Sequence, residues 1–237
     1  MSSSKFNPRR RRILALGSLL SVPVIARAQT TLGPSLMIPS FGQAPSGPDS
    51  QAAAGVPPYR SIATQPAFSH AVAEIMEWTC PYCRQINDGA VQWGGSLPKG
   101  WVFVQLPVIT DAESLRAAAL FAAIQQVAGH RLAAFGDAMF AAVQDRGQNP
   151  NDPRTLMDAA QASGIPYASF RTQNTGARVR KTAAEWLALE QAVRPQRTPT
   201  FVVAGRQVTD SSMTAARYDL LFQLLSGLVS QAMTGEH

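Results

Sequence analysis

Beyond about residue 67, the pattern of apolar and polar positions predicts strands and helices in a defined order. Residues 70–79 and 101–106 are short, mostly apolar runs of strand length, and residues 201–204 form a third such run. Between the second and third runs apolar residues recur at helical spacing, and they do so again towards the C-terminus. This order predicts an α/β domain over residues 68–233, in which a helical block separates two halves that carry strands.

The helical block is expected to contain several helices with marked ends. The sequence Thr-Asp-Ala-Glu at residues 110–113 fits a capping box that opens a helix to about Ala128. Residues 131–144 approach helical periodicity, and Asp152-Pro153 is typical of an N-cap followed by proline at the first helical position. A further helix completes the block, which is expected to cover about residues 108–192.

After this block the chain predicts a β-hairpin and one more helix. The strand at residues 201–204 is followed by Gly205-Arg206, which is typical of a tight turn, and by a second short strand at residues 207–209. Ser211 or Ser212 is expected to cap the C-terminal helix, whose apolar stripe would pack on the sheet.

Cys80 and Cys83 are the only cysteines of the chain, and they lie where the first strand meets a helix expected over residues 84–93. Pro81 is tolerated at the first helical position because its missing N–H would have no partner there, so Cys80 is the expected N-cap residue. The partial positive charge at a helix N-terminus favours a thiolate and lowers a thiol pKa below its ordinary value of about 8.5. We therefore expect Cys80 to be a nucleophile and Cys83 to be the resolving thiol.

Three alternative roles of the cysteine pair stay open. A zinc site needs about four ligands, and besides the cysteines the sequence offers only His70, His130 and His237, so no metal ligand is assigned. A structural disulfide would close a loop too short to restrict the unfolded chain much, and an unreactive pair of buried thiols is the third alternative. Redox chemistry is favoured over all three. Methionine and aromatic stripes fit an ordinary core, and no cofactor is expected.

Glu74 lies six residues before Cys80, on a strand that is apolar on both faces apart from its acids and is therefore expected to be central and parallel. A buried carboxylate at this position would have a raised pKa and could relay protons to or from Cys83. A solvent-facing glutamate is the alternative, which the apolar neighbours of Glu74 disfavour. Glu77 is expected to be an exposed charge near the rim of the site.

The net charge of +6 is concentrated at the start of the chain. Six of the 21 basic residues lie before position 29, where no acidic residue occurs, so the remaining chain has 15 residues of each sign. A formally neutral chain gives no support for nucleic acid or an anionic membrane surface as a partner.

Residues 1–28 are typical of an export signal. Residues 5–12 form a positive segment, residues 13–26 an apolar segment too short to span a bilayer comfortably, and Ala26-Arg27-Ala28 fits a cleavage site. Arg10-Arg11-Arg12 also resembles a twin-arginine signal. Export by the twin-arginine route, export by the general secretory route and an uncleaved membrane anchor all stay open.

Residues 29–67 are rich in Pro, Gly and Ser, and they are expected to form an extended or disordered tether. Export would place the domain in the periplasm, where conditions are oxidising. Because both cysteines belong to one CxxC motif, they would be free there to cycle between dithiol and disulfide.

The order of elements along the chain resembles the thioredoxin fold. A strand is followed by a CxxC motif at a helix N-terminus, by a helical block, and then by Thr198-Pro199 before a hairpin and a terminal helix. The long block is similar to the helical insertion of the DsbA family of bacterial thiol-disulfide oxidoreductases. The resemblance covers about residues 68–233. It implies a thioredoxin fold with a DsbA-like helical insertion between the half that carries the CxxC motif and the half that carries the cis-proline hairpin.

The resemblance also implies roles for individual residues. Cys80 matches the exposed nucleophile of the family, Cys83 its partner, and Glu74 the buried acid six residues before the first cysteine. Pro199 matches the cis-proline that lies against the CxxC motif. The backbone of Thr198 would then pair with an extended substrate by strand addition.

Two residues depart from the strongly oxidising members of the family. The dipeptide between the cysteines is Pro81-Tyr82, whereas those members have Pro-His, and Pro-Tyr occurs in glutaredoxins and in DsbG. Thr198 precedes the cis-proline where the oxidase usually has Val. Tyr82 is expected to tune the pKa of Cys80 through its hydroxyl or its ring. Both departures leave the direction of thiol-disulfide exchange open.

The expected function is periplasmic thiol-disulfide exchange with exported polypeptides that carry free thiols or disulfides, with disulfide formation favoured. An unidentified membrane partner would reset the cysteine pair, and the chain is expected to be a monomer. One alternative is a disulfide reductase or isomerase of DsbG-like character. Another is a non-enzymatic thioredoxin-like module that binds metal or acts as a chaperone. The export signal and the long insertion disfavour a glutaredoxin role.

Overall fold

The computed structural model describes residues 57–174 and 176–235. The strands are β1 (Arg60–Ser61), β2 (Ala71–Met76), β3 (Val102–Pro107), β4 (Thr200–Val203) and β5 (Gln207–Asp210). The helices are α1 (Pro81–Gly94), α2 (Ala112–Ala128), α3 (Leu132–Phe140), α4 (Pro153–Ala162), α5 (Tyr167–Asn174), α6 (Ala177–Val193) and α7 (Tyr218–Thr234). The expected export signal and the first part of the tether lie outside the described residues.

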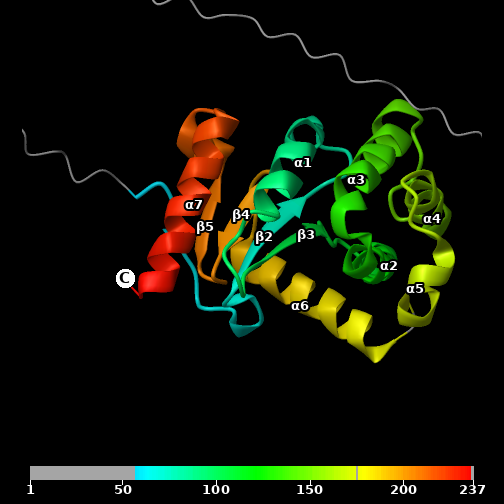
Figure 1. The fold of residues 1–237 in the computed structure, drawn as a ribbon, viewed down its shortest axis with the longest axis horizontal. Coiled ribbons are helices and arrows are strands. Elements are labelled where there is room, and N and C mark those ends of the chain that lie inside the picture. Colours follow the sequence, from blue (N-terminus) through cyan, green and yellow to red (C-terminus); the bar gives the residue numbers. More distant parts are fainter. Residues whose placement is uncertain (1–56, 175, 236–237) are drawn as a thin grey trace, which may run out of the picture. The chain divides into compact units, whose positions relative to one another are not determined.

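The five strands form one mixed sheet in the order β1-β5-β4-β2-β3. Figure 1 labels β5, β4, β2 and β3 in this sequence across the sheet. Strand β2 pairs in parallel with β3 and antiparallel with β4, so it is central as the sequence predicts. Strands β4 and β5 form the predicted hairpin. This arrangement is the α/β thioredoxin fold expected from the sequence, and it brings the carboxyl end of β2 next to the start of β4.

The edge strand β1 lies within the segment that the sequence assigns to the tether. It pairs antiparallel with β5, and the Arg60 guanidinium donates a hydrogen bond to the carbonyl of Val193. Gln65 N–H donates to the carbonyl of Gly205 at 2.9 Å, and a Cβ at Gly205 would lie only 2.4 Å from the Gln65 oxygen. The folded domain therefore begins before residue 68, which corrects the expected boundary.

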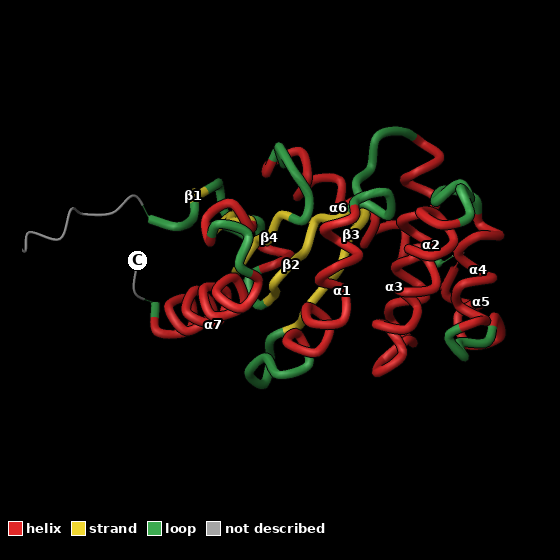
Figure 2. The backbone as a smooth tube through the Cα atoms, turned by 90° about the horizontal axis from the view of Figure 1, so that it is seen from above, coloured by secondary structure: helices red, strands yellow, loops and turns green. Residues whose placement is uncertain are grey.

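Helices cover both faces of the sheet. On one face, Val72, Phe201 and Val203 pack with apolar residues of α1 and α7. On the other face, Ala73 and Ile75 belong to a larger cluster with α2 and α6. Figure 2 shows α7 at one end of the folded domain and the helices α2 to α5 gathered at the other. The predicted helical insertion is thus a lobe beside β3, with α6 returning from it to the sheet.

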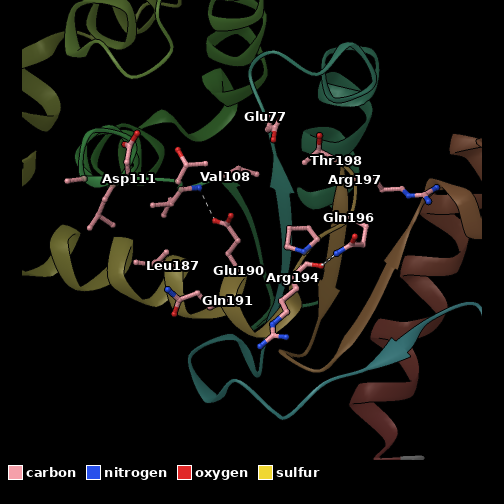
Figure 3. Close-up of a pocket in the computed structure, with 15 residues that line it drawn as sticks. Glu77, Val108, Asp111, Leu187, Glu190, Gln191, Arg194, Gln196, Arg197 and Thr198 are labelled. Atoms are coloured by element: carbon pink, nitrogen blue, oxygen red, sulfur yellow. Dashed lines mark hydrogen bonds between the residues drawn. The ribbon is translucent and has the colours of Figure 1, made fainter.

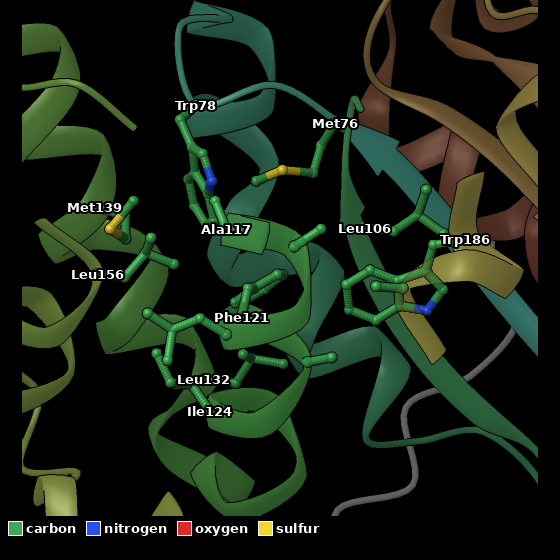
Figure 4. Packing of buried hydrophobic residues seen from close by; sticks show 14 of the residues in the cluster. Met76, Trp78, Leu106, Ala117, Phe121, Ile124, Leu132, Met139, Leu156 and Trp186 are labelled. Atoms are coloured by element: carbon green, nitrogen blue, oxygen red, sulfur yellow. The ribbon is translucent and has the colours of Figure 1, made fainter. Parts of the chain in front are cut away.

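An aromatic cluster joins this lobe to the loop that precedes the cysteine pair (Figure 4). The Trp78 ring lies 5.4 Å from that of Phe121, 6.0 Å from that of Phe135 and 5.1 Å from that of Phe140, each in an edge-on arrangement. All four side chains are buried. Such pairs add stability beyond the area they bury, so the insertion holds the position of the Trp78 loop.

Several local predictions are confirmed, and three need correction. Cys80 and Asp152 are N-caps, each followed by proline at the first helical position. The capping box of α2 joins Asp111 to Ser114, not Thr110 to Glu113. The Asp111 carboxylate accepts hydrogen bonds from the N–H groups of Glu113 and Ser114, and the Ser114 hydroxyl oxygen accepts one from the Asp111 N–H. Residues 167–174 form a helix, α5, that the sequence does not predict.

The third correction concerns the C-terminal helix. Residues 211–214 form a separate 3-10 turn that Asp210 caps through its side chain. Ala215 and Ala216 then have positive φ angles, 50° and 60°. This break forces α7 to begin at Tyr218 with Arg217 as its N-cap, so neither Ser211 nor Ser212 caps the long helix.

The aromatic cluster yields a stability prediction. Phe121→Ala should lower the free energy of unfolding by about 3–5 kcal/mol, because it leaves a cavity among Trp78, Phe135 and Trp186. Phe121→Leu should lower it less. Denaturant unfolding measures both, with the exposed Met233→Ala as a control that changes it by less than about 0.5 kcal/mol. A loss below about 1 kcal/mol in Phe121→Ala would contradict the central place of this ring.

Candidate redox-active site

Cys80 is the residue at which the chain turns from β2 into α1. Its backbone is extended, with φ −79° and ψ 118°, and its sulfur accepts a hydrogen bond from the Cys83 N–H at 3.4 Å. Pro81 occupies the first helical position. The sulfur therefore takes the place that a Ser, Thr or Asp oxygen takes in an ordinary N-cap, as the sequence predicts.

The hairpin half of the fold supplies the other wall of the site. The Thr198–Pro199 peptide bond is cis, as the resemblance implies. The Cys80 sulfur lies 3.3 Å from the carbonyl oxygen of Thr198, 118 positions away in the sequence, and in its protonated form it donates a hydrogen bond to that oxygen. The structure thus brings Cys80, Thr198 and Pro199 together.

The two cysteines have opposite electrostatic environments. A hydrogen bond with the Cys83 thiol stabilises the thiolate of Cys80 most. Smaller contributions come from the Thr198 side chain and from the N–H groups of Cys83 and Tyr82, and the sum of these effects outweighs the opposing effect of partial burial. Together they lower the pKa of Cys80 to about 5. Burial, with smaller effects of Cys80 and Glu74, raises the pKa of Cys83 far above its ordinary value. Near neutral pH the site therefore holds one thiolate and one thiol.

Glu74 lies inside the domain on the same face of β2 as α1. Its side chain is 1% exposed, and one carboxylate oxygen accepts a hydrogen bond from Gln105 Nε2 at 3.0 Å. Burial raises the pKa of Glu74 to about 7, although the Gln105 hydrogen bond acts in the opposite direction. The expected burial of this acid is confirmed, and its electrostatic effect reaches Cys83. Glu77, in contrast, is exposed.

The insertion contributes residues that sequence reasoning does not find. Gln144 Nε2 donates hydrogen bonds to the carbonyls of Trp78 at 2.9 Å and of Cys80 at 3.1 Å. Its neighbour Asp145 forms a two-point ion pair with Arg84, the residue after Cys83, at 2.6 and 2.9 Å. Gln144 and Asp145 belong to a π-helical turn, Ala141–Asp145. Turns of this kind often occur at functional sites, but no local sequence signal marks this one.

Two tyrosines lie near the reactive sulfur, one exposed and one partly buried. The Tyr82 side chain is 57% exposed at the start of α1. Tyr218 at the start of α7 lies near enough to Tyr82 and the cysteines for their charges to act on it, and its hydroxyl is 3.5 Å from Gln85 Oε1. Burial, together with those charges, raises the pKa of Tyr218.

A groove of about 790 Å³ begins beside Thr198 and runs between the end of α6 and the loop after β3 (Figure 3). Glu77 and Thr198 lie at one end and Arg194 at the other. Glu190 points across it and accepts a hydrogen bond from Ile109 N–H at 2.9 Å. Partial burial raises the pKa of Glu190. Across residues 57–174 and 176–235, no group of three or more His, Cys, Asp or Glu side chains is arranged to hold a metal ion.

The model of the DSBA-like thioredoxin domain family matches residues 101–225, which is more than half of the chain. The chain belongs to this family. The match begins after the cysteine motif, directly before β3, and ends within α7, so it covers the helical insertion and the cis-proline hairpin. Together with the similarity to DsbA proteins of several bacteria, it makes the chain a DsbA-like thiol-disulfide oxidoreductase.

The thiol:disulfide interchange protein DsbA of Bordetella pertussis is 22% identical over 161 residues, covering 68% of this chain and 76% of the relative. The oxidoreductase DsbA of Xylella fastidiosa is 26% identical, with a TM-score of 0.56 over 74% of this chain and 95% of that one. A variant of Pseudomonas aeruginosa DsbA, at 19% identity, has a TM-score of 0.61 over 75% of this chain and 96% of that one.

The environment of Cys80 predicts a pH titration. The ultraviolet absorbance of the reduced protein should show a thiolate that disappears with a midpoint near pH 5 as acid is added. Because the Cys83 thiol stabilises this thiolate most, Cys83→Ala should move the midpoint to higher pH. Cys80→Ser should abolish the signal. A midpoint close to the ordinary value of about 8.5 in the unchanged protein would contradict this electrostatic environment.

The same pKa has a consequence for stability. In the folded state it lies below the ordinary value of about 8.5, so the Cys80 thiolate stabilises the fold fully above about pH 8.5 and loses this effect as the pH falls through about 5. The free energy of unfolding of the reduced protein, measured relative to Cys80→Ser, should therefore rise from pH 5 to pH 9. A flat difference over that range would contradict this prediction.

Gln144 yields a further prediction. Gln144→Leu leaves the carbonyls of Trp78 and Cys80 without this donor, so the free energy of unfolding should fall by about 1–3 kcal/mol. Denaturant unfolding tests this, with the exposed Gln126→Leu as the matched control. Equal effects of the two substitutions would show that Gln144 does not hold the cysteine loop.

Proposed function

We propose that this protein forms disulfide bonds in exported polypeptides in the periplasm, by exchange with a Cys80–Cys83 disulfide. The observation that supports this direction most is the depressed pKa of Cys80, about 5, beside a buried partner thiol whose pKa is raised. A stabilised thiolate stabilises the dithiol form of the enzyme, and an enzyme whose reduced form is stable is an oxidant.

In the proposed reaction a substrate thiolate attacks the sulfur of Cys80 in the disulfide. The Cys80–Cys83 bond breaks, a mixed disulfide forms at Cys80, and Cys83 leaves as a thiolate that takes up a proton. The second substrate thiolate then attacks the substrate sulfur of the mixed disulfide, and Cys80 leaves as a thiolate. The substrate loses two electrons and gains a disulfide bond. The enzyme takes up these two electrons, and its cysteine pair becomes a dithiol.

Glu74 is the proposed proton donor and acceptor for Cys83. The Cys83 thiol is 1% exposed, so water has little access to it, whereas the electrostatic effect of Glu74 reaches it. A carboxyl group with a pKa of about 7 is close to evenly divided between its two forms near neutral pH. It is therefore suited to release a proton when Cys83 leaves and to accept one when the pair is reoxidised.

The substrate would bind as an extended segment beside the cis-proline. The Thr198 backbone is the proposed strand-addition partner, and the exposed Tyr82 ring, two residues after Cys80, is available to contact the bound segment. The groove that begins at Thr198 offers room for residues that flank the substrate cysteine. Recognition through backbone hydrogen bonds suits an enzyme that acts on many different polypeptides.

Export is proposed from residues 1–28, and reoxidation by a membrane redox partner completes the cycle. No helix within residues 57–174 and 176–235 combines the length and the apolar character needed to cross a bilayer. We also propose that the protein acts as a monomer, without cofactor, metal or nucleic acid.

The second candidate is a reductase or isomerase of exported proteins. The exposed Tyr82 between the cysteines and the contact of Cys80 with Thr198 favour it, because these two residues differ from those of the strongly oxidising members. The chemistry is the same, and the reduction potential separates the two candidates.

Equilibration of the purified protein with glutathione buffers measures that potential. We expect a value nearer to about −120 mV, as in DsbA, than to about −270 mV, as in thioredoxin. A value near that of thioredoxin would favour the reductase instead. A pair without reversible redox behaviour would overturn both and leave a binding module.

Substitution of each cysteine tests the order of events. Cys80→Ser should abolish oxidation of a dithiol peptide, because no mixed disulfide can form. Cys83→Ser should trap mixed disulfides between Cys80 and substrates, which non-reducing gels with mass spectrometry detect. Full turnover by Cys80→Ser would show that the mechanism is wrong.

A further inference from the structure

A line of polar side chains runs from Glu74 through the domain to the insertion. Gln105 Nε2 lies 3.0 Å from Glu74 Oε2 and 3.5 Å from Asn87 Oδ1. Asn87 Nδ2 donates to the carbonyl of Ala133 at 3.0 Å and to Asp137 Oδ1 at 3.2 Å. Glu74, Gln105 and Asn87 are each 1% exposed, whereas Asp137 is at the surface.

The direction of the hydrogen bonds along this line is determined at the end that contacts α3. Two acceptors of α3, the Ala133 carbonyl and the Asp137 carboxylate, require the amide of Asn87 to present its NH₂ group to α3. Its oxygen then faces Gln105, which must in turn present an NH₂ group. The other N–H of that group is the donor to Glu74. A reversed Gln105 would place its oxygen against two acceptors, and such contacts are strongly unfavourable in a dry interior.

We propose that Asn87 is a positioning residue of the redox site, which couples helix α3 of the insertion through Gln105 to the carboxylate of Glu74. This inference rests on the proposed function, in which Glu74 exchanges a proton with Cys83. It adds that the orientation of two buried amides sets the pH at which this exchange takes place. The insertion is then part of the acid–base apparatus as well as a support for the cysteine loop.

A second observation supports the coupling. Helix α3 has glycine at position 136, directly against Asn87, and a Cβ there would lie 2.3 Å from Asn87 Oδ1 and 2.6 Å from Nδ2. The absence of a side chain at Gly136 is therefore what allows the Asn87 amide to reach its acceptors on α3.

The balance at Glu74 is sensitive to this orientation. Glu74 Oε1 and Gln105 Oε1 have no hydrogen-bond partner among the described residues. The hydrogen bond from the Gln105 side chain therefore opposes, without help from a second donor, the rise in the pKa of Glu74 that burial causes. The titratable groups around Glu74 are Cys80 and Cys83 from α1 and, through Asn87, Asp137 from α3. Strand β4 (Thr200–Val203) has no titratable side chain, and β3 contributes the uncharged Gln105.

The test is a carbon-13 NMR titration of the Glu74 carboxyl group in protein labelled at glutamate, with the signal assigned by Glu74→Gln. The cysteines are kept as the disulfide, so that no thiol titrates in the same range. Asn87→Leu should move the midpoint upwards by at least about half a pH unit, a threefold rise in proton affinity. Gln105→Leu should move it further, and Gly136→Ala should move it in the same direction.

Two controls separate positioning from general loosening. Gln125 forms hydrogen bonds of 2.9 and 3.1 Å with the backbone N–H and carbonyl of Gln105, and these bonds do not involve the side-chain amide of Gln105. Gln125→Leu should therefore destabilise the fold without moving the titration midpoint of Glu74. Gly227 has open space around it, and Gly227→Ala is the matched control for Gly136→Ala. Circular dichroism confirms that each variant is folded.

The outcomes distinguish this inference from the proposed function. An unchanged Glu74 midpoint in folded Asn87→Leu, while the parent protein oxidises a dithiol peptide, would overturn the coupling alone. An equal shift in Gln125→Leu would also overturn it, because the effect would then be structural. Failure of the parent protein to exchange with any dithiol peptide would overturn the proposed function whatever the titration shows. A shift confined to Asn87→Leu, Gln105→Leu and Gly136→Ala supports the proposal.

Discussion

The contact between the sulfur of Cys80 and the Thr198–Pro199 segment is the constraint on which the rest of the structure depends. The two sides of this contact are 118 positions apart, and they meet because β2 and β4 are neighbours in one sheet. The start of α1 turns the sulfur towards the hairpin, and the hairpin places a backbone carbonyl against it. A reactive thiol and a surface for an extended chain therefore arise at the same point.

The helical insertion has two kinds of effect on this point. Its apolar side chains hold the Trp78 loop, while its polar ones, Gln144, Asp145 and Asp137, contact the backbone of Cys80, the side chain of Arg84 and the buried amide of Asn87. The proton affinity of Cys80 is lowered because its sulfur lies at the N-terminal end of α1, and that of Cys83 is raised because its sulfur is buried one turn deeper. The insertion fixes that helix on the side away from α7.

Much of this arrangement follows from local sequence signals. Strand β2, the N-cap at Cys80, the hairpin and the burial of Glu74 are all predicted, because each depends on neighbours within a few residues. The contacts of Gln144 and Asn87 are not predicted, since amide side chains have no periodicity that separates a buried partner from a solvated one. The start of α7 is missed because two alanines with positive φ end the preceding turn, and nothing in Ala-Ala-Arg marks that geometry.

The edge strand β1 has a consequence for how the domain can be shortened. Its two residues pair with β5, and without them the N–H and C=O groups along that side of β5 would face water. Open strand edges of this kind recruit other chains. A protein cut at residue 68 would keep both cysteines and the cis-proline, yet it would gain a surface prone to self-association. The edge strand β1 thus protects the domain from association with its own copies.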